Sequence, residues 1–204
     1  MKNWTNEILL NQQNQEPKII FYTYCEELGK HYLEQDFKYF KSRPRIERRN
    51  MDIIESINFW SSRNNKINYS VSLEILPYVK SKSLKKWIKS NQIGRNEYIY
   101  APTNLRPRCL DIYSHTRQDF ENLVIQMNDN IISDLENFGS EIKDLERFII
   151  DNKYSDGIVP DNFLAYVCMT NPNLIEEALA NYGDRLSKER VNLIRQKVNA
   201  NSKH

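Results

Sequence analysis

The strongest constraint on the fold is a run of strictly alternating residues in the first half of the chain. Ile67, Tyr69, Val71, Leu73 and Ile75 alternate there with Asn68, Ser70, Ser72 and Glu74. A period of two places apolar side chains on one face of a β-strand and polar ones on the other. The run therefore predicts a strand with one buried and one solvated face, and with Val71 and Leu73 in the core.

A second run of apolar residues precedes this strand. Ile53, Ile57 and Phe59 share one face of a strand over residues 52–61, and the polar residues 63–66 separate the two runs. Asn tolerates the left-handed backbone angles of tight turns, and two Asn residues stand in this segment. The pattern predicts an antiparallel hairpin, with Pro77 at the end of its second strand.

Helices and shorter strands are expected around the hairpin. Residues 17–32 have apolar residues at helical spacing, with Pro17 in the first turn. A short helix follows Ser83, which is a plausible N-cap, and its apolar side carries Leu84, Trp87 and Ile88. Further strands are expected at residues 37–39, around Ile46, and at residues 98–100 and 109–113.

The last part of the chain is predicted to be helical. Thr116 and Asp119 have the spacing of a helix start, and apolar residues follow at helical spacing as far as Phe138. Gly139 and Ser140 interrupt this pattern, residues 155–157 form a turn, and helices are expected from Pro160, over 172–183 and over 187–198. A sheet followed by helices predicts an α+β fold.

Three segments are expected within one domain, because 204 residues fit a single large domain. They are a polar N-terminal arm (1–16), an N-terminal helix with an antiparallel sheet of four to six strands (17–116), and a C-terminal helical half packed on the sheet (117–204). The first residues lack a secretory signal, and no apolar run is long enough to span a bilayer. We therefore expect a cytoplasmic protein.

The three cysteines, Cys25, Cys109 and Cys168, are odd in number and far apart in the sequence. This pattern is typical of buried reduced thiols rather than disulfides. No phosphate-binding glycine loop and no metal-ligand spacing is present, so we expect neither a metal nor a cofactor. A Cys–His pair formed by Cys109 and His115 has no support from the spacing, and an enzyme with an unrecognised site is only a third hypothesis.

Basic residues are concentrated in the stretch 37–50. Its cationic side chains are Lys38, Lys41, Arg43, Arg45, Arg48 and Arg49. They suit phosphate contacts, with Tyr39 or Trp60 stacking on bases, in a single-stranded nucleic-acid-binding protein. They equally suit the solvated face of strands, and this interpretation is favoured because the aromatic residues here alternate toward the core and the pI is only about 8.3. Nucleic-acid binding is therefore expected to be weak or absent.

Acidic residues dominate the predicted helices. Residues 119–161 carry eleven acidic and three basic side chains, and the acidic set includes Asp129, Asp134, Glu136, Glu141 and Asp144. An exposed helix usually carries basic partners four residues along, and these are nearly absent before residue 144. The five carboxylates are either a solvated helix surface or a docking surface for a basic protein partner.

One resemblance bears on the function. The segment GKHYLEQDFKYFKS and the later segments IESINFWSSRNNKINYSVSLEI and LKKW are similar to a group of small bacterial α+β proteins, which recur among immunity proteins of toxin systems. This resemblance implies an immunity- or antitoxin-like protein that blocks a basic toxin, such as a nuclease, by occlusion. It implies no catalytic residue and leaves the oligomeric state open.

Overall fold

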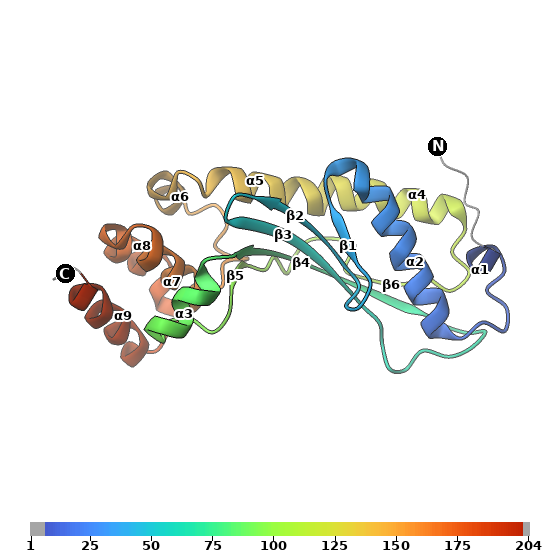
Figure 1. Ribbon diagram of the computed structural model, residues 1–204, viewed down its shortest axis with the longest axis horizontal. Helices are drawn as coiled ribbons and strands as arrows, with labels where there is room; N and C mark the ends of the chain where they lie inside the picture. Colours follow the sequence, from blue (N-terminus) through green and yellow to red (C-terminus); the bar gives the residue numbers. More distant parts are fainter. Residues whose placement is uncertain (1–6, 202–204) are drawn as a thin grey trace. The chain divides into compact units, whose positions relative to one another are not determined.

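The computed structural model describes residues 7–201 (Figure 1). The first elements are α1 (Glu7–Leu10), α2 (Pro17–Tyr32) and the 3-10 helix η1 (Leu33–Gln35). The strands are β1 (Lys38–Phe40), β2 (Arg45–Asn50), β3 (Ile53–Trp60), β4 (Ser72–Ser81), β5 (Tyr98–Tyr100) and β6 (Cys109–Asp111). The other helices are α3 (Leu84–Asn91), α4 (Arg117–Gln126), the π-helix η2 (Met127–Ile132), α5 (Ser133–Glu141), α6 (Leu145–Asp151), α7 (Pro160–Thr170), η3 (Pro172–Leu174), α8 (Ile175–Tyr182), η4 (Gly183–Arg185) and α9 (Lys188–Asn201).

The six strands form one antiparallel sheet in the order β1-β2-β3-β4-β5, and β6 also pairs with β4. Tyr39 lies opposite Ile46 between β1 and β2, and Leu73 lies opposite Leu110 between β4 and β6. An N-terminal helix, an antiparallel sheet and a largely helical C-terminal part confirm the α+β prediction. The expected polar N-terminal arm falls partly outside the described residues, and α1 is its described helix.

The chain divides into two compact units. The first unit contains Met1–Arg49, Ser56–Pro77 and Asn104–Asp134. The second unit contains Asn50–Glu55, Tyr78–Thr103 and Leu135–His204. Each unit is thus assembled from three separate stretches of sequence, and β3, β4 and the helical stretch α4–η2–α5 each contribute residues to both.

The core of the first unit forms where α2 meets β1. Helix α2 has the predicted bounds, and its buried residues include Tyr24, Cys25 and Leu28. Gly29 stands where a Cβ atom would come within 2.5 Å of the Tyr39 ring, so only glycine permits this contact. The close approach fixes the helix against the edge strand.

Strand β4 confirms part of the alternating pattern and corrects the rest. Val71, Leu73 and Ile75 are fully buried, as the period of two predicts. Ile67 and Tyr69, which were expected in the same buried row, are instead 55% and 73% exposed. They belong to a loop, residues 61–71, which we call the β3–β4 loop.

The β3–β4 loop departs from strand geometry because its polar side chains satisfy backbone groups locally. Asn65 Oδ1 accepts a hydrogen bond from Ser72 N (2.9 Å), and Ser72 Oγ accepts one from Ser62 N (2.7 Å). Asn68 adopts a left-handed conformation with φ of 58°. Asn and Ser side chains compete in this way with a strand ladder. The predicted four-residue turn is therefore a longer loop.

The prediction that Pro77 ends a strand is wrong, because β4 continues to Ser81. Along the edge that Pro77 N faces, Ile75 N donates to Arg108 O (2.7 Å) and Ser81 N to Glu97 O (3.1 Å). Pro77 lies between the part of β4 that pairs with β6 and the part that pairs with β5. No ladder hydrogen bond is needed there, so a residue without an N–H is tolerated.

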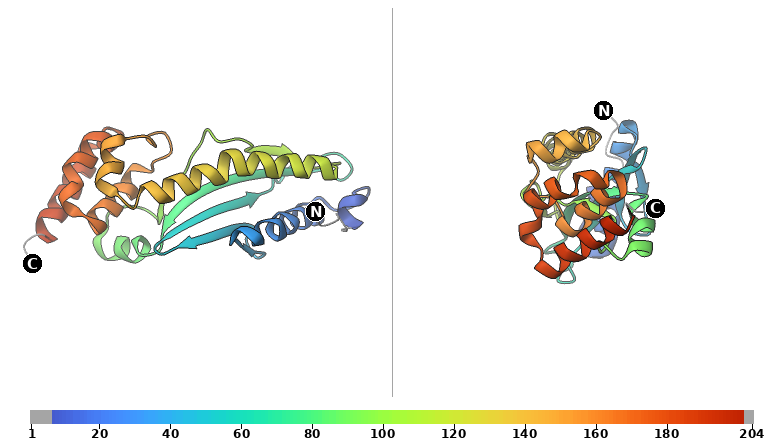
Figure 2. Two further views of the ribbon diagram at one scale, coloured as in Figure 1. Left: turned by 90° about the horizontal axis from the view of Figure 1, so that it is seen from above. Right: turned by 90° about the vertical axis from the view of Figure 1, so that its left-hand side faces the viewer.

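Helix α4 begins where the sequence predicts. Thr116 Oγ1 accepts from Asp119 N (3.2 Å), and Asp119 Oδ2 accepts from Thr116 N (2.8 Å), which completes a capping box. The helical stretch runs through η2 and α5 without a break in the chain (yellow in Figure 2). The predicted interruption at Gly139 and Ser140 lies slightly later, because α5 ends at Glu141 and α6 begins at Leu145. Gly139 is buried in α5 and faces Glu55, whose Oε1 would lie 3.2 Å from an added Cβ.

Aromatic side chains fill the core of the second unit. Tyr100 stacks on Phe138 with ring centroids 4.2 Å apart, and Tyr154 stacks on Phe148 at 5.5 Å. Phe163, on α7, extends this cluster to Tyr182 on α8. Helices α7, α8 and α9 pack together in this unit (Figure 2). The helices predicted from Pro160, over 172–183 and over 187–198 are confirmed as α7, η3 with α8, and α9.

Two buried polar residues at the start of α7 connect this helix to other elements of the second unit. Asp161 accepts hydrogen bonds from Arg190 Nε (2.5 Å) and Nη2 (3.0 Å), which anchors α9. Asn162 accepts from Arg95 N (2.7 Å) and donates to Tyr98 O (2.8 Å), which anchors the segment before β5. Buried polar groups with complete partners hold elements in a unique arrangement, so these two residues are structural.

Asp52 connects the β2–β3 turn to the start of α3. Its carboxylate accepts hydrogen bonds from the Ser81 hydroxyl and from the Ser83 backbone N (2.8 Å) and hydroxyl (2.7 Å). Ser83 is the N-cap residue as predicted, but Ser81 Oγ is the atom that accepts from Leu84 N (3.1 Å). Burial acts to raise the pKa of Asp52, but these hydrogen bonds and Lys82 outweigh it and lower the pKa below its ordinary value.

Replacing Asp52 with Asn should therefore have a pH-dependent effect on stability. A carboxyl group whose pKa is lower in the folded state stabilises the fold above its unfolded pKa of about 3.9 and stops doing so as the pH falls through the folded value. We expect Asp52→Asn to lower the free energy of unfolding at neutral pH, and the difference from the wild type to shrink as the pH falls below about 4. Urea unfolding at several pH values measures this. A constant difference would contradict the role given to the charge.

Candidate functional site

The acidic candidates lie on or directly after the helical stretch α4–η2–α5. Residues 118–142 contain six carboxylates and no Lys, Arg or His. Asp129 and Glu136 are exposed there, and Asp134 and Glu141 are half-buried. Asp129 and Asp134 belong to the first unit, and Glu136, Glu141 and Asp144 to the second. Each unit thus carries part of the acidic set.

Two of the five acidic candidates have structural roles. Asp144 is the N-cap of α6, and its carboxylate accepts from Arg147 N (3.2 Å). Glu141 forms an ion pair with Lys153 (3.4 Å). An exposed ion pair of this kind contributes at most about 1 kcal/mol, but it does reduce the free charge at Glu141. Asp129 and Glu136 are consequently the candidates that present the most accessible charge.

The basic candidates all belong to the first unit, on and beside β1 and β2. Lys38, Lys41, Arg43 and Arg49 are exposed, and Arg45 and Arg48 are half-buried. The guanidinium groups of Arg45 and Arg48 lie over the rings of Phe40 (4.1 Å) and Phe37 (4.6 Å). Arg45 and Arg48 thus form cation–π contacts with aromatic rings of the same chain.

A buried glutamate that the sequence analysis did not single out engages the basic stretch further. Glu47, only 6% exposed, accepts a hydrogen bond from Arg45 Nε (2.8 Å) and lies 4.0 Å from Arg49. Lys41 pairs with Glu26 of α2 (3.4 Å). In the sequence, the only sign that Glu47 pairs with these cations is its position among them in β2. Several of the predicted phosphate ligands thus already have partners inside the unit.

The Cys109 and His115 pair has no catalytic arrangement. Cys109 is exposed on β6, which corrects the expectation that all three cysteines are buried; Cys25 and Cys168 are buried. His115 Nδ1 shares a hydrogen bond with the Tyr24 hydroxyl (3.0 Å), and burial lowers the pKa of His115 below its ordinary value. The histidine therefore joins α2 to the start of α4. His204 lies outside the described residues.

The part of the chain that the structure describes contains neither a metal-ligand cluster nor a candidate transmembrane helix. Within residues 7–201, no three His, Cys, Asp or Glu side chains come close enough to hold a metal ion. None of the helices between these residues combines the length and hydrophobicity of a transmembrane span.

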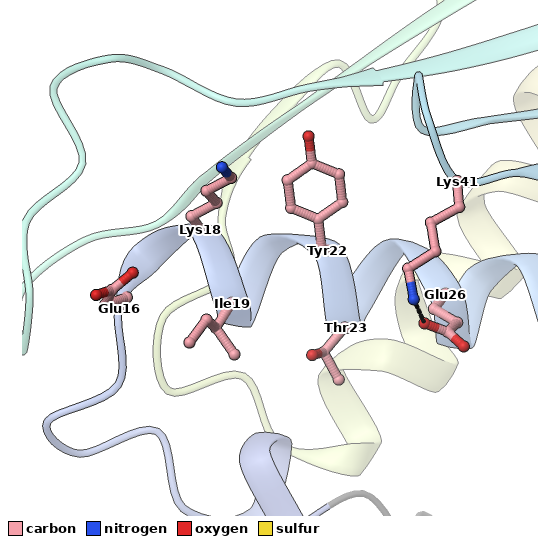
Figure 3. A pocket seen from close by; sticks show the side chains of 7 residues that line it. All are labelled: Glu16, Lys18, Ile19, Tyr22, Thr23, Glu26 and Lys41. Atoms are coloured by element: carbon pink, nitrogen blue, oxygen red, sulfur yellow. Dashed lines mark hydrogen bonds and ion pairs between the residues drawn. The ribbon is translucent and has the colours of Figure 1, made fainter.

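An open groove of about 400 Å³ lies along the outer side of α2 (Figure 3). Its lining residues are Glu16, Lys18, Ile19, Tyr22, Thr23, Glu26 and Lys41. The ion pair between Lys41 and Glu26 crosses one end of the groove (Figure 3). Two acidic and two basic side chains leave the lining without net charge. The groove therefore selects no particular class of ligand.

The feature that the sequence analysis missed is the exposed apolar surface of the β3–β4 loop. Trp60, which ends β3, is 61% exposed, and Ile67 and Tyr69 are also exposed. Periodicity assigned Ile67 and Tyr69 to the core, so only the serine and asparagine content of residues 61–70 pointed to a loop.

Folding also redistributes the charge. Residues 1–116 carry 19 basic and 12 acidic side chains, and residues 117–204 carry 10 and 15. The first unit, by contrast, has 14 basic and 13 acidic side chains and the second has 15 and 14. Each unit is nearly neutral because it draws on both halves of the sequence. Charge complementarity therefore acts through local surfaces and not through a whole unit.

No protein-family model, curated protein or solved structure matches the chain.

Proposed function

We propose that this chain is a cytoplasmic protein-binding protein of the immunity or antitoxin type, which binds a basic protein through the exposed acidic surface of α4, η2 and α5. The observation that carries the proposal is the absence of any Lys, Arg or His over residues 118–142, where Asp129 and Glu136 are exposed. A helical segment with several carboxylates and no cation in its own sequence generates a local negative potential that attracts a basic partner.

The contrast with the basic stretch supports this choice. Arg45 and Arg49 contact Glu47, and Lys41 contacts Glu26, so these cations have lost part of their attraction for an external anion. The 118–142 segment contains no cation of its own, although Arg117 and Lys153, just outside it, pair with Glu121 and Glu141. Of the two charged candidates, the acidic segment is the one with no opposite charge within its own sequence.

The mechanism needs no covalent chemistry. An acidic helix surface speeds the encounter with a basic protein and then covers the basic groups that the partner uses on its own substrate. For a nuclease toxin, those groups bind phosphate, so a carboxylate surface competes with nucleic acid for them. Exposed polar residues between the charges, such as Asn130 and Asn137, supply neutral hydrogen-bond donors and acceptors.

The test is a charge reversal restricted to the two exposed carboxylates. Asp129→Lys with Glu136→Lys leaves the N-cap at Asp144 and the ion pair of Glu141 in place. A basic protein is captured from the natural host with the wild-type chain, and its association rate is then measured by surface plasmon resonance. Loss of steering within one interface slows association by about one to three decades, so we expect a decrease in that range.

A matched control has the same change in net charge elsewhere. Glu177 and Asp184 are exposed and lie outside the acidic run, so Glu177→Lys with Asp184→Lys should leave the association rate close to that of the wild type. Equal rates for the two double variants would show that only net charge matters and would refute the assigned surface. Failure to capture any basic protein would also refute the proposal.

A further inference from the structure

The β3–β4 loop and the strand end before it present two aromatic rings to solvent. Trp60 is the last residue of β3, and Tyr69 stands near the end of the loop. Both are large side chains that globular proteins normally bury, and each exposes well over half of its surface. Trp and Tyr that remain exposed on an ordered loop are typical of a binding surface.

Hydrogen bonds hold the loop in one conformation. The Asn65 amide donates to Ser61 Oγ (2.6 Å), and the Lys66 backbone exchanges hydrogen bonds with Ser70 (3.0 and 3.1 Å). At the tip, Asn68 accepts from Asn14 N (2.6 Å) and donates to Asn14 Oδ1 (2.8 Å). A loop that is already ordered loses little conformational entropy on binding. The loop therefore holds Tyr69 in position before a ligand binds.

The β3–β4 loop itself is cationic, and the carboxylate of Asp111 contacts its last residue, Val71 (2.9 Å). No acidic residue occurs between Glu55 and Glu74, and this segment contains the exposed Arg63 and Lys66. Lys66 Nζ lies 5.7 Å from the centroid of the Tyr69 ring. Arg63 forms no ion pair with a described residue. Aromatic and cationic side chains are thus interleaved over residues 60–69, and Lys66 contacts one of the two rings.

A third cation approaches from a neighbouring turn. Phe59 N donates to Pro44 O (2.8 Å), so the β1–β2 turn lies beside the end of β3. Arg43, the exposed residue before Pro44, therefore lies at the same end of β3 as Trp60. Unlike Arg45 and Arg49, it has no carboxylate partner among the described residues.

We propose that Trp60 and Tyr69, together with Arg43, Arg63 and Lys66, form a binding surface for single-stranded nucleic acid. The rings stack on unpaired bases, and the three cations contact phosphates, which is the combination that sequence-tolerant single-strand binders use. Bases in a duplex have no free face, so single strands are favoured. This surface is distinct from the acidic one and does not rest on the protein-binding function.

The exposure of Trp60 and Tyr69 changes the expectation for nucleic-acid binding. Weak or absent binding was expected because aromatic residues near the basic stretch alternate toward the core. This holds for Phe37, which is buried, but not for Trp60 or Tyr69. The binding surface also shifts, because Arg63 and Lys66 lie outside the predicted basic stretch.

Oligothymidylate and oligouridylate of about 12 nucleotides, a length within the usual site sizes, are suitable probes. Binding is measured by fluorescence anisotropy of labelled oligonucleotides, because the chain has three tryptophans and Trp60→Ala removes one of them. At about 50 mM salt we expect dissociation constants on the order of 1–100 μM, with a decrease in affinity as salt rises. Trp60→Ala and Tyr69→Ala should each weaken binding about tenfold. Arg63→Glu with Lys66→Glu should weaken it further and lower the slope of log affinity against log salt by about 2.

Two controls test whether loss of exposed apolar surface or a change in net charge is enough to weaken binding. Ile67→Ala removes exposed apolar surface from the same loop, and Lys143→Glu with Lys188→Glu changes net charge equally at exposed positions of the second unit. Both should bind like the wild type. Unchanged thermal melting of the Trp60 and Tyr69 variants will confirm that they fold.

Four results would overturn the proposal. They are no detectable binding at about 100 μM probe in low salt, where even non-specific contact is measurable; equal affinity for a DNA duplex; wild-type affinity in both aromatic variants; and tighter binding of an oligoglutamate peptide than of either oligonucleotide. The last result would assign the surface to an acidic protein. A clear difference between the two oligonucleotides would identify whether RNA or DNA is the preferred ligand.

Discussion

Replacing Phe138 with Ala is expected to lower the free energy of unfolding by about 3–5 kcal/mol, the range for removal of a buried aromatic ring. Phe138 is fully buried, stacks on Tyr100 and meets Phe148 and Tyr154 edge-on, with centroids 5.2 Å away. Its loss removes contacts with three rings at once and leaves a cavity that such rigid neighbours fill poorly. Chemical denaturation monitored by near-UV circular dichroism measures the effect.

Ile150 provides the matched control for this experiment. It lies on α6 in the same unit and is 70% exposed, so Ile150→Ala should change stability by less than about 0.5 kcal/mol. A loss below about 1 kcal/mol for Phe138→Ala would contradict the aromatic cluster as the core of the second unit.

The second large effect compares two residues of the alternating run. Leu73→Ala should lower the free energy of unfolding by about 2–4 kcal/mol, because Leu73 is fully buried in β4. Ile67→Ala should have an effect of less than about 0.5 kcal/mol, because this side chain lies in the exposed β3–β4 loop. Urea unfolding of the two variants and the wild type under the same conditions gives both values.

This pair distinguishes the strand predicted from periodicity from the loop that the structure describes. If Ile67 were in the buried row with Leu73, the two substitutions would have similar costs. A cost above about 2 kcal/mol for Ile67→Ala would therefore restore the longer strand and remove the structural basis of the loop surface.

Much of the fold could be predicted because it depends on local patterns. Pro17 at the first position of α2 and the box formed by Thr116 and Asp119 specify helix starts through groups only three residues apart. The burial of Val71 and Leu73 follows from the period of the strand. These features involve neighbours in the sequence, so the sequence contains all the information that they require.

The candidate sites were less predictable because charge depends on distant partners. The sequence shows six cations at residues 38–49 but does not show that Glu26, on another element, contacts Lys41. Nor does it show that Glu47 is buried beneath two arginines. By contrast, the absence of cations within residues 118–142 is visible in the sequence.

The sequence by itself determined the α+β class, the main helix starts and the side of β4 that faces the core. The tertiary structure decided where periodic patterns stop applying. Ile67 and Tyr69 leave the strand because Asn65 and Ser72 form competing hydrogen bonds, and Gly139 stays helical because it packs against Glu55. Pro77 remains in β4 because it lies between the part of the strand that pairs with β6 and the part that pairs with β5. For Gly139 and Pro77 the deciding contacts come from residues far apart in the sequence, whereas the hydrogen bonds that form the loop are local but do not show in the periodicity.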